Sequence, residues 1–187
     1  MKKKRFLLLL ILISVLSSGK VLSQPEVGQS APALSGLKMI NKDFPDIENK
    51  FVFLDFWATY SSPEVRSLDH LNILAERFKK RMVFLAVSEE NEEQVRSFLQ
   101  NKLWFNIYFG LDIDLIFHKE FKVEDIPVYY LISPDNIILA TGISDELQDY
   151  KLDSIVNKVD SIRMIKTSRI PIFHRNSKLI ATHQKTK

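Results

Sequence analysis

The segment Phe51 to Glu64, FVFLDFWATYSSPE, limits the possible folds of this chain more than any other stretch. Its first half is a continuous apolar run rich in Phe and Val, which is typical of a strand buried on both faces. Its second half carries the signals of a helix start, with Ser61 as N-cap, Pro63 in the first turn and Glu64 placed for a capping box. The segment therefore predicts a buried strand that passes through a short turn into a helix.

The rest of the chain continues this alternation of strands and helices. Apolar residues at spacings of three and four predict a helix over 63–80, and an apolar run predicts a strand over 82–88. The acidic run 89–93 is best explained as the start of the next helix, where acids favour the macrodipole, rather than as a cation site. We then expect a strand at 104–109, a helix at 112–121, a hairpin of 129–133 with 137–141, and a helix at 145–162. This order predicts an α/β protein whose mixed central sheet is covered by helices on both faces.

The turn of the opening segment resembles a known motif. Trp57, Ala58, Thr59 and Pro63 match the WAT-W-C-G-P-C signature of the thioredoxin superfamily, and in particular of the TlpA/ResA-like thiol–disulfide oxidoreductases. Tyr60 replaces the aromatic Trp, and Ser62 replaces the Gly. Ser61 and Glu64 stand where the two redox cysteines would be, and the whole chain contains no Cys. The resemblance, which begins with a V-G-x-x-A-P pattern at residue 27, implies a thioredoxin fold with a short N-terminal β extension but without the redox reaction.

The resemblance also implies a place where a peptide could bind. Ile126-Pro127 matches the family's cis-proline, which contacts substrate backbone, although X-Pro bonds in general are cis in only about 5–6% of cases. We therefore expect a cis bond here and a groove for a peptide or a segment of a partner protein. The residues expected to form the groove are Trp57, Tyr60, Ser61, Ser62, Pro63, Ile126 and Pro127.

Asp55 is the polar interruption in the first strand. Thioredoxins have a buried aspartate at the matching position, and the resemblance places Asp55 beneath Glu64. Burial and a second carboxylate would both raise its pKa. Asp55 is then either a retained structural group or, with Ser61 and Glu64, part of an acid–base or nucleophilic centre. A serine needs a base, and the nearest histidine, His70, lies two turns down the helix, so a capping role for Ser61 is favoured.

The four histidines, His70, His118, His174 and His183, are scattered along the chain. None is paired with another ligand at a spacing typical of metal sites. We expect His70 and His118 to be surface or half-buried helix residues. The sequence predicts neither a metal site nor a cofactor.

The N-terminus has the three parts of a secretory signal peptide. A basic start at 2–5 is followed by an apolar run at 6–16, too short to span a bilayer comfortably, and by a cleavage-like site that ends at Ser23. We expect cleavage after Ser23 and export to the periplasm or the exterior. The expected organisation is a signal peptide at 1–23, a thioredoxin-like domain at 24–162 and a weakly ordered basic tail at 163–187.

Charge is unevenly distributed along the chain. The formal net charge is +3, but removal of the signal's five basic side chains leaves 21 basic and 23 acidic groups. This balance does not indicate nucleic-acid binding. The tail holds seven Lys and Arg and no acid, so residues 24–162 carry a net charge of −9. The tail also contains one apolar patch, Ile170-Pro171-Ile172-Phe173, which could dock on the body.

These features leave three functional hypotheses. The favoured one is an exported, redox-inactive binding protein that holds a peptide or partner protein in the groove at Pro127. The second is a non-thiol enzyme that uses Asp55, Ser61 and Glu64. The third is a structural role in which the basic tail makes weak electrostatic contact with an acidic partner or an anionic membrane surface, without a stable membrane span.

Overall fold

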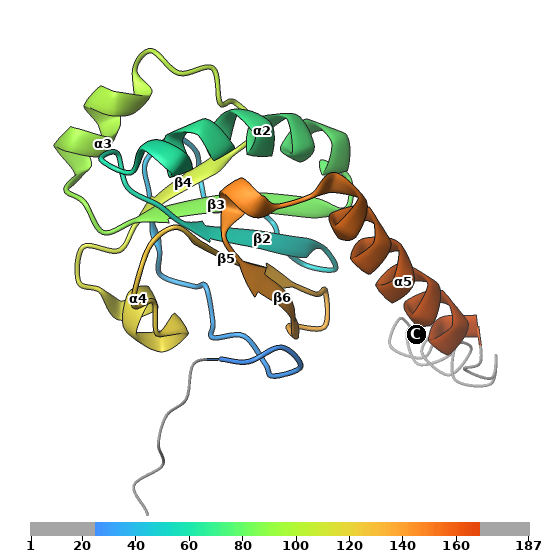
Figure 1. Cartoon of the computed structure of the whole chain (residues 1–187). Helices are drawn as coiled ribbons and strands as arrows, with labels where there is room; N and C mark the ends of the chain where they lie inside the picture. The colour runs from blue at the N-terminus through green and yellow to red at the C-terminus, as the bar shows by residue number, and fades with distance from the viewer. Residues whose placement is uncertain (1–24, 169–187) are drawn as a thin grey trace, which may run out of the picture.

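The computed structural model describes residues 25–168, except for the side chains of Pro63 and Glu64. It contains a six-stranded sheet in the order β1-β4-β3-β2-β5-β6 (Figure 1). β2, β3 and β4 are parallel, whereas β1, β5 and β6 pair antiparallel to their neighbours. The strands are β1 Lys38–Met39, β2 Phe51–Phe56, β3 Met82–Ser88, β4 Tyr108–Leu111, β5 Val128–Ile132 and β6 Ile138–Gly142. The predicted mixed sheet is confirmed.

Helices cover both faces of this sheet, as predicted. α2, α3 and α5 contribute to the core on one face, and α4 lies on the other (Figure 1). The elements are α2 Ser62–Phe78, α3 Glu92–Leu99, α4 Ile116–Phe121, the 3₁₀ turn η1 Ser144–Glu146 and α5 Asp149–Ser168. The described residues contain no helix that is both long and apolar enough to cross a membrane.

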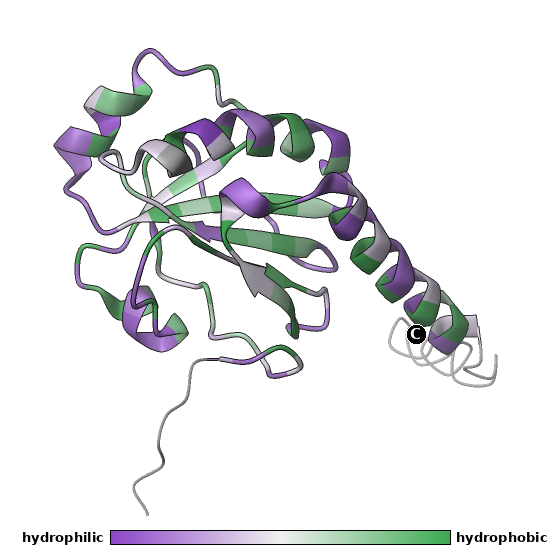
Figure 2. Cartoon of the chain, viewed as in Figure 1, coloured by the Kyte–Doolittle hydropathy of each residue, from purple (hydrophilic) through white to green (hydrophobic). Residues whose placement is uncertain are grey.

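β2 lies at the centre of the molecule, and all six of its residues are buried. Successive side chains of a strand point to opposite faces. Phe51 and Phe53 therefore pack beneath α2, while Val52 and Phe56 pack on the side of α4. This two-sided burial explains the continuous apolar run in the sequence, and Figure 2 shows the same apolar character along the central strands, with mixed polarity on α2 and α5.

The predicted strand at 104–109 begins later than expected, because β4 starts at Tyr108. Residues before it are held in a loop by two polar contacts with α2. The Trp104 indole donates to Asp69 at 2.7 Å, and the Asn106 backbone N–H donates to the side chain of Asn72 at 3.0 Å. The second bond satisfies a backbone N–H that would otherwise pair in a ladder, and the first fixes the Trp104 ring against α2.

The helix predicted over 112–121 starts only at Ile116. The Asp112 carboxylate accepts the backbone N–H groups of Ile116 at 2.8 Å and His118 at 2.7 Å, while Leu115 takes a left-handed conformation. The loop is thus fixed by a side chain that precedes the helix by four residues.

The two ends of the fold also differ in detail from expectation. The N-terminal β extension consists of the short strand β1 and one isolated bridge between Ser30 and Ile137. The last helix, α5, continues to Ser168, beyond its predicted end at Ile162. The expected signal peptide, and the tail from residue 169 onward, lie outside the described residues.

Candidate functional site

The turn between β2 and α2 begins with a buried residue. The Trp57 backbone N–H donates to Val87 of β3 at 3.0 Å, so the chain stays against the sheet for one residue beyond β2. The Trp57 ring is 0% exposed and packs on Phe98 and Phe109, with ring centroids 5.8 and 5.5 Å away. Trp57 was expected to line the groove. The structure places it in the core instead, because the aromatic side chains of α3 and β4 enclose its ring.

A buried carboxylate fixes the next part of the turn. Glu90, 9% exposed at the end of β3, accepts the Thr59 backbone N–H at 2.6 Å and the Thr59 hydroxyl at 2.7 Å. The same carboxylate accepts the Ser88 hydroxyl at 3.1 Å and the side-chain amide of Gln94. Glu90 therefore holds the segment that leads into α2.

Sequence reasoning missed this role for Glu90. It grouped Glu90 with the acids that open α3, and two of those acids, Glu92 and Glu93, do lie in the first turn of that helix. Asn91 is the N-cap of α3 and accepts the Gln94 N–H at 2.9 Å. The available signal was the position of Glu90, two residues after a buried strand and directly before Asn91, a residue suited to N-capping.

Ser61 is the N-cap of α2, as predicted, but its side chain makes no capping hydrogen bond. An N-cap side chain accepts from the N2 or N3 backbone N–H. Here Pro63 occupies N2 and has no N–H, which removes one of the two donors. The predicted capping hydrogen bond of the Ser61 side chain is therefore wrong. The reciprocal bond from Glu64 stays a prediction, because the Glu64 side chain lies outside the described part of the structure. Ser61 is half-buried and Ser62 is exposed.

Tyr60 lies beside these residues and is 66% exposed. The N-terminus of α2 therefore presents an aromatic ring and two hydroxyl-bearing residues to solvent. The predicted contribution of these residues to a peptide groove stays a prediction.

Asp55 is buried, with 1% exposure, on the face of the sheet covered by α2. It accepts a hydrogen bond from the Ser144 hydroxyl, which is itself buried in η1. The carboxylate is thus tied to the segment that precedes α5. Its predicted proximity to Glu64 and its raised pKa stay predictions.

The two histidines of the body are both bound to carboxylates. His70 Nε2 lies 2.7 Å from Asp149 Oδ1, and His118 Nδ1 lies 2.7 Å from Asp112 Oδ2. His118 was expected at the surface or half-buried, but its side chain is only 8% exposed, because it packs edge-on against Phe56. Among the described side chains, neither an imidazole nor a carboxylate hydrogen-bonds to the Ser61 hydroxyl.

The Ile126–Pro127 peptide bond is cis, as predicted. Beside it lies a pocket of about 340 Å³, named here the Pro127 pocket. Its lining consists of residues 123–128 with Tyr130, Gly142 and Ile143. Of the residues expected in the groove, only Ile126 and Pro127 line this pocket.

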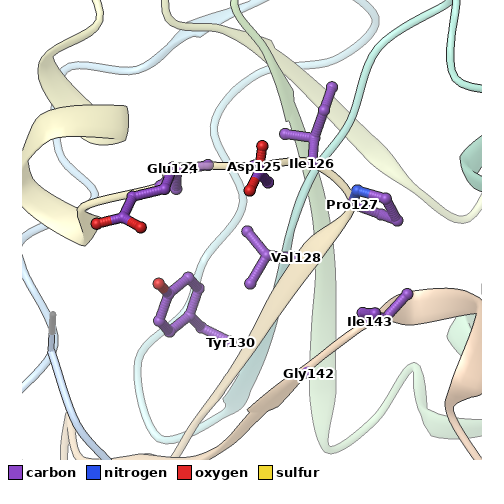
Figure 3. Close-up of a pocket in the computed structure, with 9 residues that line it drawn as sticks. Glu124, Asp125, Ile126, Pro127, Val128, Tyr130, Gly142 and Ile143 are labelled. Carbon is purple, nitrogen blue, oxygen red and sulfur yellow. The ribbon is translucent and has the colours of Figure 1, made fainter.

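Figure 3 shows how the Pro127 pocket is built. The segment before β5 carries Glu124 and Asp125 along one side, and Ile143, just after β6, lies on the other. Val128 lies between them. Tyr130 donates its hydroxyl to the Phe121 carbonyl at 2.9 Å, and burial raises the pKa of this phenol, so it stays protonated.

Sequence reasoning did not identify most of this lining. Gly142 and Ile143 come from β6 and the residue after it, and they reach the pocket only because β6 pairs antiparallel with β5. Among residues 25–168, no three His, Cys, Asp or Glu side chains gather in a way that could hold a metal ion.

The strand order, the β2–α2 turn and the cis-proline together define a thioredoxin-like protein. A family model described as thioredoxin-like matches residues 49–138. The curated proteins similar to this chain include thiol–disulfide oxidoreductases named ResA. ResA of Bacillus cereus (strain ATCC 10987 / NRS 248) is 28% identical over 177 residues, covering 85% of this chain and 99% of the relative. The thioredoxin-like protein YneN of Bacillus subtilis (strain 168) is 26% identical over 118 residues, covering 59% and 68%.

Solved structures share the fold. A putative thiol–disulfide oxidoreductase C-terminal domain from Bacteroides thetaiotaomicron superimposes with a TM-score of 0.60 at 22% identity, covering 73% of this chain and 99% of that domain. A putative DsbE from Chlorobium tepidum gives a TM-score of 0.61 at 18% identity, covering 72% and 99%. This chain therefore has the fold of these thioredoxin-like structures, with Ser61 and Glu64 at the two expected cysteine positions and no Cys in its sequence.

Proposed function

We propose that this protein binds an extended peptide, or a segment of a partner protein, without thiol–disulfide chemistry. The observation that carries the proposal is the Pro127 pocket, which is open beside the cis-proline although both cysteine positions hold other residues. A serine at Ser61 cannot form a disulfide, so the binding partner would be retained by non-covalent contacts alone.

The chemistry of the Pro127 pocket favours a particular class of peptide. Its walls are apolar, from Ile126, Val128 and Ile143, and they suit an aliphatic or aromatic side chain. Glu124 and Asp125 are exposed at the rim, and neither has an ion-pair partner among the described residues. A Lys or Arg next to the apolar side chain would complement these carboxylates.

We further propose that binding takes place outside the cytoplasm. The basic start, the apolar run at 6–16 and the cleavage-like site at Ser23 support export. N-terminal sequencing of protein recovered from the producing cell is expected to begin at Gln24. A chain that begins at Met1 would contradict cleavage.

A peptide array probed with the purified protein tests the binding proposal. We expect binding to apolar peptides with basic neighbours, and we expect Ile143→Asp to weaken it at least tenfold, a loss of about 1.4 kcal/mol. Ile143 is 44% exposed, so the substitution should leave the fold intact. The matched control is Ile73→Asp on α2, where Ile73 is 68% exposed and outside the pocket.

Two outcomes would contradict the proposal. One is an array on which no peptide binds the folded protein. The other is binding that Ile143→Asp and Ile73→Asp weaken equally, which would place the peptide elsewhere.

A further inference from the structure

A second and larger hollow lies at the end of the sheet where β2 begins. It has a volume of about 730 Å³, within the range of ligand-binding clefts, and is named here the Phe44 groove. Three segments form it: residues 33–37, the loop at 44–50 with Val52, and the end of β5 with the turn that follows. It is separate from the Pro127 pocket, which lies near the opposite end of β5.

The Phe44 groove combines an apolar lining with an acidic border. Leu34, Leu37 and Ile47 contribute to its lining, and Phe44 is 38% exposed there. The bordering loop reads Asp-Phe-Pro-Asp-Ile-Glu over 43–48, and Glu48 lines the groove. Lys50 also lines it and lies 3.4 Å from Asp46, so Asp43 and Glu48 are the acids of this loop without an ion pair among the described residues. An occupant that fits this surface would be apolar and positively charged.

The last described helix ends beside this groove. Arg163 donates to the Asn49 side chain at 3.3 Å, and its Nε lies 3.6 Å from Asp135 Oδ2. Asn49 lines the groove, and Asp135 lies between the lining residues Pro134 and Asn136. α5 ends five residues later at Ser168, a further rise of about 7.5 Å.

The sequence that follows α5 has the composition that the groove requires. Residues 169–175 read Arg-Ile-Pro-Ile-Phe-His-Arg, an apolar patch between two arginines. Ile170 is two residues beyond Ser168, and an extended chain covers about 7 Å over that distance. The patch can therefore turn back to the groove without a long linker.

We propose that Ile170–Phe173 of the same chain occupies the Phe44 groove, with Arg169 and Arg175 facing its acidic border. Attachment through α5 gives the patch an effective concentration of the order of millimolar, which favours the chain's own groove over that of a second copy. The basic tail is then fastened to the acidic body, and its apolar residues are not free for a membrane or another partner.

The natural absence of Cys allows a direct test by disulfide trapping in the full chain. The test variant carries Glu48→Cys, at the border of the groove, with His174→Cys, next to the patch. The control variant carries Lys119→Cys, exposed on α4, with the same His174→Cys. Under a mild oxidant, we expect the test pair to form an intramolecular disulfide at least tenfold faster than the control pair, as measured by mass spectrometry.

A third variant checks that the patch itself is responsible. Adding Phe173→Asp to the test pair is expected to lower the cross-linking rate to that of the control, while circular dichroism verifies the fold. Equal rates for the two pairs would overturn the proposal, and so would insensitivity to Phe173→Asp. Disulfides that form mainly between two chains would also overturn it, because they would assign the groove to a second copy.

Discussion

At the scale of single residues, Glu90 does most to fix the turn that replaces the redox motif. One carboxylate accepts hydrogen bonds from Thr59, Ser88 and Gln94, which belong to the β2–α2 turn, β3 and α3. Hydrogen bonds to a charged acceptor are roughly twice as strong as neutral ones. Its position couples the N-terminus of α2 to the end of β3.

Glu90→Gln should therefore destabilise the protein. The amide keeps the shape of the side chain, but its NH₂ group cannot accept the Thr59 or Ser88 protons. We expect the free energy of unfolding to fall by about 2 kcal/mol, measured by urea denaturation. The control is Glu93→Gln, an exposed acid in the first turn of α3, which should change stability by less than about 0.5 kcal/mol. Equal effects of the two substitutions would mean that the hydrogen bonds accepted by Glu90 do not contribute to the free energy of unfolding.

A second effect at this scale concerns alkaline pH. Partial burial, which disfavours the charged phenolate, raises the pKa of Tyr129 above its ordinary value of 10.0, and its ring stacks on Phe53 against the core. The unfolded phenol ionises near pH 10, whereas the folded one ionises only at higher pH. The stability linked to Tyr129 is therefore present below pH 10 and is lost as the pH rises through the raised pKa.

The measurement is the free energy of unfolding between pH 8 and about pH 11. We expect the wild type to lose stability more steeply above pH 10 than Tyr129→Phe does. Tyr150→Phe, on the exposed face of α5, should keep the wild-type slope. A Tyr129→Phe curve parallel to that of the wild type would contradict the assignment.

At the scale of elements, α5 is attached to the body by two kinds of contact. Leu152 and Val156 are 1% and 0% exposed in the main core. On the outside, Arg77 of α2 pairs with Asp149 and Asp153, both at 3.0 Å. These charges are almost half exposed, and such surface pairs contribute only about 0–1 kcal/mol.

The apolar contacts should therefore dominate the docking of α5. We expect Leu152→Ala to lower the free energy of unfolding by about 2–4 kcal/mol, because it leaves a cavity in the core. Arg77→Ala should lower it by about 1 kcal/mol or less. Urea denaturation of the two variants shows which substitution lowers the free energy of unfolding more. A larger decrease for Arg77→Ala than for Leu152→Ala would show that the ion pairs dominate the docking of α5.

At the scale of the whole molecule, the architecture could be predicted because its signals are local. The apolar run of β2, the helical spacing of α2 and the turn at 134–136 each lie within one short segment. The hydrogen bonds from Thr59 to Glu90 could not be predicted, because they join residues 31 positions apart. The burial of His118 and the contribution of Ile143 to the Pro127 pocket likewise depend on which elements the fold places together.

The retained scaffold leads to a prediction about the missing chemistry. Ser61 is the N-cap of α2 and Glu64 is three residues further on, at N3. Side chains three apart on a helix have Cβ atoms about 5–6 Å apart, close enough for a disulfide after a small adjustment. A thiol at Ser61 would also lie at a helix N-terminus, which lowers the pKa of a cysteine.

We therefore expect Ser61→Cys/Glu64→Cys to reduce insulin in the presence of dithiothreitol, and the wild type to be inactive because it has no thiol. Ser61→Cys alone is the control, since it can form a mixed disulfide but cannot resolve it. Activity of the double variant alone would show that the scaffold supports thiol–disulfide exchange once two thiols are present. A folded double variant that forms its internal disulfide yet leaves insulin intact would show that the surface around Tyr60 and Pro127 has also diverged from that of an oxidoreductase.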